Sequence, residues 1–503
     1  MKHQSLMKIK YLLLFLLVLF QSCKSQRNIT SEANKKSFLQ EQAEIGTPIW
    51  NYLRSNPYTL NSLTEADFTR KIDSLKYIYT AQLNEFKGKL DKQSFNDEAL
   101  SINYAFDKFI LEYPHIHENF TGEKITLSHV NQSRLSKNLK NFNAINLLSN
   151  AALKEYIISF ISIESNKKLK SGMYDKLDNQ QLTAYWNTIV TTFKNQDTND
   201  FWKQEYLYNQ IDNLGIKNID TFYADFMSSS KTSEYKIKIR EMYESNKKGR
   251  ASHIIETYKK VDGFKLEMHL FLPDTTVFKE NRPTIVYFHG GSWSEGKPDW
   301  FFETAKEYAK QGWIATAVEY RIKGRQGTYP FEAVKDAKSA IRWLRKNSKK
   351  YNINTNIIVA TGNSAGGHLS IATSLVENWN EETDDITINP KPNIIIVNSA
   401  VYDLTSNTNR WIRGYDENKD LVKEISPHNL IKKTATKFLL IHGEQDRNCP
   451  YNTAVSFYEQ MKSLGNSIEL HAIKDGEHFI WYGQHSQEVE QITRDYINTL
   501  NLK

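Results

Sequence analysis

Gly362-Asn-Ser364-Ala-Gly-Gly367 is the most informative segment of the sequence. It directly follows the apolar run 357–360, which is typical of a buried strand, and it opens a segment of helical character. A serine at a sharp turn from strand to helix needs small neighbours, because side chains beside it would clash with the crossing backbone. The sequence therefore predicts that Ser364 stands above a sheet with its hydroxyl available for chemistry.

The region around this turn alternates between strand-like and helical segments. The expected strands span residues 253–258, 264–272, 284–288, 314–320, 356–361, 394–398, 438–441 and 468–473. Helical stretches lie between the later strands, at 331–346, 365–377, 453–464 and 487–500. This alternation predicts an α/β fold with a doubly wound, mostly parallel sheet, in which function sits at the carboxyl ends of the strands.

Glycine and proline mark where this region begins. Of the 21 glycines, five lie between residues 23 and 245 and sixteen follow, and eight of the 11 prolines also follow. A long stretch with few turn-forming residues is typical of long helices. Helical periodicity supports this at Phe68, Ile72, Leu75 and Tyr79. We therefore expect an all-α helical domain at residues 23–245 and a sheet domain at residues 246–503.

Length and charge exclude several classes of protein. A chain of 503 residues is long enough for two domains with separate cores. The net charge of +7 is small, and three of the lysines that contribute to it lie in the N-terminal segment considered next. The charge is too low for the electrostatic footprint of nucleic-acid binding, so no nucleic-acid partner is expected.

The N-terminus has the features of an export signal. Lysines at its start precede the uncharged run 11–20, which is shorter than the roughly 20 residues that span a bilayer as a helix. Cys23 ends this segment, so residues 1–22 resemble a bacterial lipoprotein signal peptide with Cys23 as the lipidated residue, although Phe20 stands where leucine is usual. Lys24 favours the outer membrane. We expect an exported protein that meets the membrane through a lipid anchor only.

Cysteine and motif counts also limit the chemistry. Cys449 is the only other cysteine, so no intrachain disulfide forms if Cys23 carries lipid, and no Cys-x-x-Cys motif exists. We expect Cys449 to act as a small buried hydrophobe rather than as a second nucleophile. His115 and His117 have no further ligand nearby in the sequence and are interpreted as surface histidines. Without a phosphate-binding or zinc-binding motif, no metal or nucleotide cofactor is expected.

A glycine turn supplies the partner that a serine nucleophile needs. His289-Gly290-Gly291-Ser-Trp293 ends the expected strand 284–288, well upstream of Ser364. Glycines without side chains let backbone N–H groups approach an acyl oxygen. Gly290, Gly291 and Ala365 are therefore the candidate oxyanion-hole residues.

A base and an acid should follow the serine in chain order. Asp446 follows the strand 438–441, and His478 follows the last strand, so we assign these two residues as acid and base. Asp403 is the competing acid. The competing histidines lie in less favourable places, inside strands, in helices or in the glycine turn; they are His289, His368, His442, His471 and His485.

Residues 250–503 resemble α/β-hydrolases of the esterase and lipase class related to hormone-sensitive lipase and to bacterial acetyl- and feruloyl-esterases. The resemblance rests on residues 289–293, 319–321, 329–330, 336, 362–367, 446 and 478. It implies that Ser364 attacks an ester carbonyl, that His478 moves the proton, and that Asp446 orients His478. The expected function is therefore a serine carboxylic-ester hydrolase.

Sequence features near the motifs suggest a class of substrate. The segment 404–437 is too short for a large lipase lid, so long-chain lipids are not expected. Aromatic residues near the motifs offer faces for sugar rings; they are Trp293, Trp300, Phe301, Phe302, Trp411, Trp481 and Tyr482. Together with the export signal, they favour removal of acetyl or other small acyl groups from carbohydrate. Arg321 and Arg325 either meet an acidic sugar or form structural salt bridges.

Two other functions remain open at this point. A serine peptidase of the prolyl-oligopeptidase class shares the catalytic core, and a glycan-binding protein with vestigial activity would retain the fold. The helical domain either binds polysaccharide, binds a partner or caps the active site. Sequence alone does not separate these roles.

Overall fold

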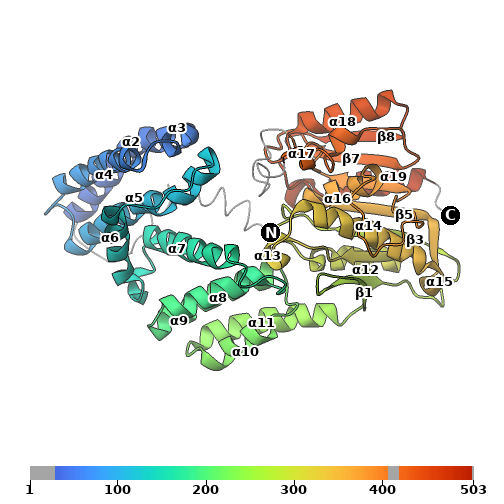
Figure 1. Ribbon diagram of the computed structural model, residues 1–503, viewed down its shortest axis with the longest axis horizontal. Helices are drawn as coiled ribbons and strands as arrows, with labels where there is room; N and C mark the ends of the chain where they lie inside the picture. Colours follow the sequence, from blue (N-terminus) through green and yellow to red (C-terminus); the bar gives the residue numbers. More distant parts are fainter. Residues whose placement is uncertain (1–28, 406–418, 501–503) are drawn as a thin grey trace. The chain divides into compact units, whose positions relative to one another are not determined.

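The computed structural model describes residues 29–405 and 419–500 (Figure 1). Within it the chain divides into two compact units. The first takes in the residues up to Ser171 together with 185–202, and the second takes in 172–184 and everything from Lys203 onward. The signal segment, Cys23 and Trp411 lie outside the described residues.

The described chain up to residue 250 is helical. Its α-helices are α2 (Ile29–Ser55), α3 (Pro57–Asn61), α4 (Glu65–Glu85), α5 (Lys92–Thr121), α6 (His129–Asn138), α7 (Ala151–Lys170), α8 (Gln180–Thr192), α9 (Gln196–Asn213), α10 (Asp220–Ser229) and α11 (Ser233–Arg250). The last of these helices ends at Arg250, and strands begin at Ile254. The division into compact units falls elsewhere, because residues 203–250 group with the sheet.

Local sequence explains how these helices form. Thr64 caps α4, and its side chain accepts a hydrogen bond from the Asp67 N–H. The predicted stripe on α4 is buried, and Phe68 stacks on Tyr113 of α5 at 4.2 Å. His117 on α5 is also buried and donates from Nδ1 to the Asn61 carbonyl, so its interpretation as a surface histidine was wrong.

The second unit contains an eight-stranded sheet with the order β1-β2-β4-β3-β5-β6-β7-β8. The pairs β1–β2 and β2–β4 are antiparallel, and every later pair is parallel. The strands are β1 (Ile254–Val261), β2 (Phe264–Phe271), β3 (Arg282–Phe288), β4 (Ile314–Val318), β5 (Ile353–Asn363), β6 (Ile394–Asn398), β7 (Lys437–Gly443) and β8 (Ile468–Ile473). The predicted mostly parallel sheet is confirmed.

Helices cover both faces of this sheet. Alternate residues of β3 show the two sides, since Val286 and Phe288 join one core cluster and Ile285 and Tyr287 join the other. The first cluster includes side chains of α14 (Pro330–Lys346), α16 (Ala365–Leu375) and α18 (Tyr451–Ser463), and the second includes those of α12 (Phe302–Lys310) and α19 (Ser486–Thr499). Shorter helical segments lie in the connections of this unit, among them η3 (Pro298–Phe301), α13 (Lys323–Gln326), α15 (Ser348–Tyr351), α17 (Lys419–Val422) and η5 (Pro427–Leu430). The sheet is therefore doubly wound, as predicted.

This topology brings distant motifs together. Strands β3, β5, β6, β7 and β8 are consecutive neighbours and run parallel, so their carboxyl ends share one edge. The glycine turn follows β3, Ser364 follows β5, Asp446 follows β7 and His478 follows β8. Among the described residues, no helix is both long enough and apolar enough to span a bilayer.

Candidate active site

Ser364 occupies a tight turn between β5 and α16. Its φ of 54° and ψ of −120° are unfavourable for a residue with a side chain. The turn is held because the Ser364 N–H donates to the Asn398 carbonyl at 3.0 Å and its carbonyl accepts from the His368 N–H. The predicted strand, turn and helix around this serine are therefore present.

Close packing explains the glycines beside the serine. A β-carbon on Gly366 would lie 1.9 Å from the Phe288 carbonyl oxygen, and one on Gly362 would lie 2.4 Å from the same oxygen. Neither position tolerates a side chain, because the end of β3 passes directly beside the turn. The same approach brings the residues that follow β3 close to Ser364.

The three candidate oxyanion-hole residues surround the serine from two elements. A β-carbon on Gly290 would lie 3.6 Å from the Ser364 β-carbon, so the glycine backbone runs alongside the nucleophile. Gly291 has a φ of 104°, and a side chain there would collide with the Glu295 carbonyl. Ala365 is the first residue of α16, so its N–H has no acceptor within the helix. These features suit N–H donors directed at a developing negative charge.

His289 braces this turn rather than taking part in proton transfer. Its Nδ1 lies 2.8 Å from the Gly290 carbonyl, and its ring stacks on Tyr320 at 4.2 Å. The Tyr320 hydroxyl donates to the His289 carbonyl at 2.6 Å. Burial lowers the pKa of His289 to about 4, so the imidazole stays neutral at physiological pH.

Asp446 and His478 form a hydrogen-bonded pair. The His478 Nδ1 lies 2.8 Å from Asp446 Oδ2, and both side chains are buried. Asp446 Oδ1 accepts hydrogen bonds from the N–H groups of Asn448 and Cys449, each at 2.8 Å. Burial by itself would raise the pKa of Asp446, but hydrogen bonds with His442 and His478 hold it well below its usual range. The carboxylate therefore stays ionised and fixes the tautomer of His478.

His442 contacts the acid Asp446, although its place inside a strand gave no reason to expect a role in the site. Its Nε2 donates to the Cys449 carbonyl at 2.7 Å and lies 3.3 Å from Asp446 Oδ2. It thus ties together the turn that carries Asp446. The signal available in the sequence was the short spacing between this histidine and the acid.

Cys449 lies next to the nucleophile. Burial raises the pKa of its thiol well above the usual value and Asp446 adds to the effect, whereas a hydrogen bond with the Ser364 side chain opposes it. The thiol therefore stays protonated, which agrees with its interpretation as a small buried residue. Within the described residues, Asp446, Cys449 and His478 are the group with metal-ligand chemistry, their ligand atoms lying within 4.8 Å of one another. The hydrogen bond between two of its members already accounts for this group.

The competing acid and histidines have other contacts. Asp403 accepts hydrogen bonds from the backbone and hydroxyl of Thr405. His368 is fully buried beneath the turn, where it contacts the Ile425 carbonyl at 2.8 Å, and burial lowers its pKa to about 4. His471 and His485 lie near the carboxylates of Glu469 and Glu488, respectively.

The two arginines form structural ion pairs. Arg321 is 2% exposed and pairs with Asp336 and Glu381, and Arg325 is 3% exposed and pairs with Glu319 and Asp178. Buried arginines with these partners do not face an acidic sugar. Of the two interpretations that the sequence left open, the salt bridges are the correct one.

The aromatic residues fall into two groups. Trp293, Phe301 and Phe302 pack inside the domain, against His368, Tyr287 and Phe271 respectively. Three others lie near the site: the Trp300 ring is 6.0 Å from that of His289, the Trp481 ring is 5.6 Å from that of His478, and Tyr482 adjoins Trp481 and is 40% exposed.

Comparisons with known proteins agree with this arrangement. The BD-FAE family model matches residues 268–461, which include the glycine turn, Ser364 and Asp446. Esterase LipC of Mycobacterium tuberculosis is 28% identical over 204 residues, which cover 37% of this chain and 49% of that protein. The acetylxylan esterase of Xylanibacter ruminicola is 27% identical over 255 residues, 48% of each chain.

The sheet domain has the α/β-hydrolase fold and is similar in sequence to esterases. Among solved structures, the apo form of Thermogutta terrifontis esterase 2 is 28% identical to this chain, with a TM-score of 0.47; the match covers 50% of this chain and 96% of that one. The chain spans about half the length of the curated relatives it matches.

Proposed function

We propose that this chain is a serine carboxylesterase. The observation that carries the proposal is the 2.8 Å contact between His478 Nδ1 and Asp446 Oδ2, at the same sheet edge as Ser364 on its strained turn. A hydrolase that acts through serine needs this pair of groups and a set of oxyanion donors beside the nucleophile.

The proposal gives each group a task that its contacts support. Because the Nδ1 proton is directed at the Asp446 carboxylate, Nε2 of His478 is left as the proton acceptor for the Ser364 hydroxyl. The serine oxygen attacks the ester carbonyl, and His478 then returns the proton to the departing alcohol. The N–H groups of Gly290, Gly291 and Ala365 stabilise the oxyanion. Water activated by the same histidine releases the acid and restores the serine.

The proposed substrate is carbohydrate that carries acetyl or other small acyl groups. The similarity to an acetylxylan esterase supports this class. Aromatic rings lie beside the motifs: Trp300 is near His289, and Trp481, with Tyr482 next to it, is near His478. These rings offer faces on which a sugar stacks. The proposed location is the cell envelope, through a lipid on Cys23.

Hydrolysis of p-nitrophenyl acetate, butyrate and octanoate by the chain from Lys24 tests the esterase proposal. We expect acetate to be the best substrate and Ser364→Ala to remove the activity. Turnover that is equal in the variant would contradict the assignment of the nucleophile. Absence of turnover on every ester would favour a peptidase or a glycan-binding role.

Release of acetate from acetylated xylan tests the finer proposal. Tyr482→Ala should raise the KM for acetylated xylan and leave the KM for p-nitrophenyl acetate unchanged, because only the polymer offers sugar rings for stacking. Exposed Tyr77→Ala in α4 is the matched control. An equal effect of Tyr482→Ala on both substrates would contradict sugar stacking at this position.

A further inference from the structure

The oxyanion turn after β3 has an unfavourable backbone. Ser292 and Trp293 have φ values of 56° and 51°, and the glycines on either side, Gly291 and Gly296, have φ values of 104° and 112°. Consecutive left-handed residues with side chains persist only where the surrounding structure holds them. The contacts that hold this turn therefore determine where the Gly290 and Gly291 N–H groups lie.

Residues at the end of α9 hold the far side of the turn. The Gly296 N–H donates to the Asn213 carbonyl at 2.9 Å. Lys297 is buried, and its Nζ donates to the Ile211 carbonyl at 2.7 Å and to Asn246 Oδ1 at 3.0 Å. A buried ammonium group with two directed acceptors fixes the backbone that carries it. All three acceptors come from the helical part of the chain.

The start of α13 (Lys323–Gln326) holds the near side of the turn. The Lys323 N–H donates to the Trp293 carbonyl and the Gly324 N–H donates to the Ser294 carbonyl, both at 2.9 Å. One of these bonds is accepted by Trp293, which has a positive φ, and the other by its neighbour Ser294. The position of α13 is thus transmitted directly to the oxyanion turn.

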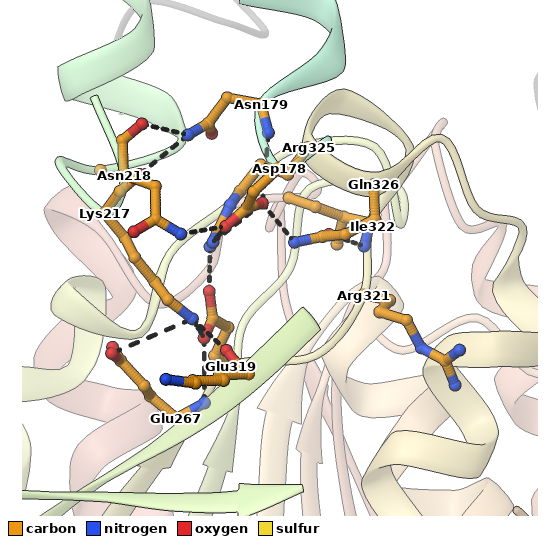
Figure 2. Close-up of polar contacts among 12 residues, drawn as sticks. Asp178, Asn179, Lys217, Asn218, Glu267, Glu319, Arg321, Ile322, Arg325 and Gln326 are labelled. Atoms are coloured by element: carbon orange, nitrogen blue, oxygen red, sulfur yellow. Dashed lines mark hydrogen bonds and ion pairs between the residues drawn. The ribbon is translucent and has the colours of Figure 1, made fainter. Parts of the chain in front are cut away.

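Asp178 in turn holds α13 (Figure 2). Its carboxylate accepts from Arg325 Nη2 at 3.1 Å and from Gln326 Nε2 at 2.8 Å, and it also accepts from Asn218 at 2.8 Å. The Gln326 carbonyl accepts from Gln180 Nε2 at 3.1 Å. Asp178 and Gln180 therefore bond the Arg325 guanidinium and the side chain and carbonyl of Gln326 in this short helix.

Lys217 extends this network of ion pairs through Glu319. Its Nζ lies 2.5 Å from Glu319 Oε2, and Glu319 also pairs with Arg325 (Figure 2). Figure 2 shows Arg321 directed away from this group, in agreement with its separate ion pairs. The charges alternate from Asp178 through Arg325 and Glu319 to Lys217, so every buried charge has an opposite partner.

We propose that Asp178 and Lys297 are positioning residues for the oxyanion hole, so that the segments 178–180 and 211–246 set the reaction rate without contacting substrate. This inference rests on the proposed esterase function. It assigns the part of the helical region that groups with the sheet to the catalytic unit. It differs from a capping role, because these residues act through the backbone of the turn.

Asp178→Asn and Lys297→Met test the inference in the full chain. Removal of one oxyanion donor lowers kcat by about 100- to 1000-fold, so we expect displacement of the turn to lower it by about 10- to 100-fold. KM for p-nitrophenyl acetate should stay within about twofold. A trifluoromethyl ketone, which mimics the tetrahedral intermediate, should bind more weakly by the same factor as the fall in kcat/KM. Exposed Asp385→Asn and Lys310→Met are the matched controls.

Hydrogen–deuterium exchange separates this inference from the esterase proposal. In both variants the amides of residues 290–297 should exchange faster, and those of β5 should not change. Unchanged exchange at residues 290–297, or an unchanged affinity for the ketone, would overturn the inference. An inactive wild-type chain whose turn is still loosened by the substitutions would overturn the esterase function alone. Asn246→Ala, which removes one acceptor of Lys297, gives a milder variant should the others not fold, and it should show the same changes at smaller amplitude.

Discussion

The two sides of the proposed active site are built in different ways. The acid–base side is local: Asp446 receives its hydrogen bonds from residues 442–449 and from His478, all within two neighbouring strands and their turns. The oxyanion side is assembled from distant segments, because its turn at residues 289–297 depends on bonds from residues 211–246 and, through α13, from Asp178.

This difference predicts where substitutions act. Changes on the acid–base side should remove proton transfer and leave the oxyanion donors in place. Changes on the oxyanion side should weaken transition-state stabilisation and leave the Asp446–His478 pair intact. Both sides act on the attack by Ser364, so without this nucleophile neither proton transfer nor oxyanion stabilisation contributes to the rate.

The largest effect is expected for Ser364→Ala. With no nucleophile, kcat should fall by about 10⁶-fold, to the level that the remaining groups provide. Initial rates with p-nitrophenyl acetate measure this, and Ser370→Ala, a buried serine two turns along α16, is the control. A fall of less than about 100-fold would show that another group attacks the ester.

Asp446→Asn should have the next largest effect and breaks the acid–base side alone. Loss of the carboxylate leaves His478 without the partner that fixes its tautomer, so kcat should fall by about 10⁴-fold. The ketone analogue should lose less affinity than kcat/KM loses, because the oxyanion donors remain in place. Asp475→Asn, on the exposed turn after β8, is the control. An unchanged kcat would reopen Asp403 as the acid.

Gly290→Ala breaks the oxyanion side alone. The added methyl group would lie 3.0 Å from the Asn363 carbonyl and 3.6 Å from the Ser364 β-carbon, so the turn must shift. We expect a loss of about 100- to 1000-fold in kcat, equal to that of one missing oxyanion donor. Gly249→Ala, at which a methyl group meets no atom closer than 3.9 Å, should keep full activity. Equal kcat in the two variants would contradict the assigned oxyanion hole.

The smallest effect is expected on the free energy of unfolding at acid pH, to which Glu319 on the oxyanion side contributes. Burial would raise the pKa of Glu319, but Arg325 and Lys217 outweigh it and lower the pKa to about 2. Because the folded-state pKa is below the unfolded value of 4.5, Glu319 stabilises the fold above pH 4.5 and loses that contribution as the pH falls towards 2. Urea unfolding at about pH 6 and about pH 3.5 should show a shallower loss of stability in Lys217→Met/Glu319→Gln than in the wild type. Equal slopes would contradict the lowered pKa.

The sequence indicated the acid–base pair, the turn at Ser364 and the oxyanion glycines, but it did not indicate the distant contacts that hold the oxyanion turn. The turn at Ser364 and the strand 468–473 could be found because their signals, glycine spacing and alternating apolar residues, lie within a few residues. The expected strand 314–320 ends at Val318, and the side chains of the next two residues, Glu319 and Tyr320, bond Lys217 and the His289 carbonyl. The partners of Arg325 and Lys297 lie far away in the chain, and no local pattern indicates them.

The domain boundary shows the same limit. Glycine and proline content located the change from helices to strands near residue 245. It carried no information on which helices pack with the sheet, since that depends on contacts such as those of Asn213 and Asn246. Helices 203–250 therefore look like the rest of the helical region in sequence but belong to the compact unit of the hydrolase.

Reaction with a fluorophosphonate, followed by mass spectrometry of the peptides, identifies the nucleophile directly. The reagent requires a serine activated by a base and an oxyanion hole that accepts the phosphonyl oxygen, so it reports on both sides of the site at once. We expect a single adduct on Ser364, slowed strongly by Asp446→Asn and moderately by Asp178→Asn. An adduct on Cys449 or on another residue, or a wild type that does not react, would contradict this expectation.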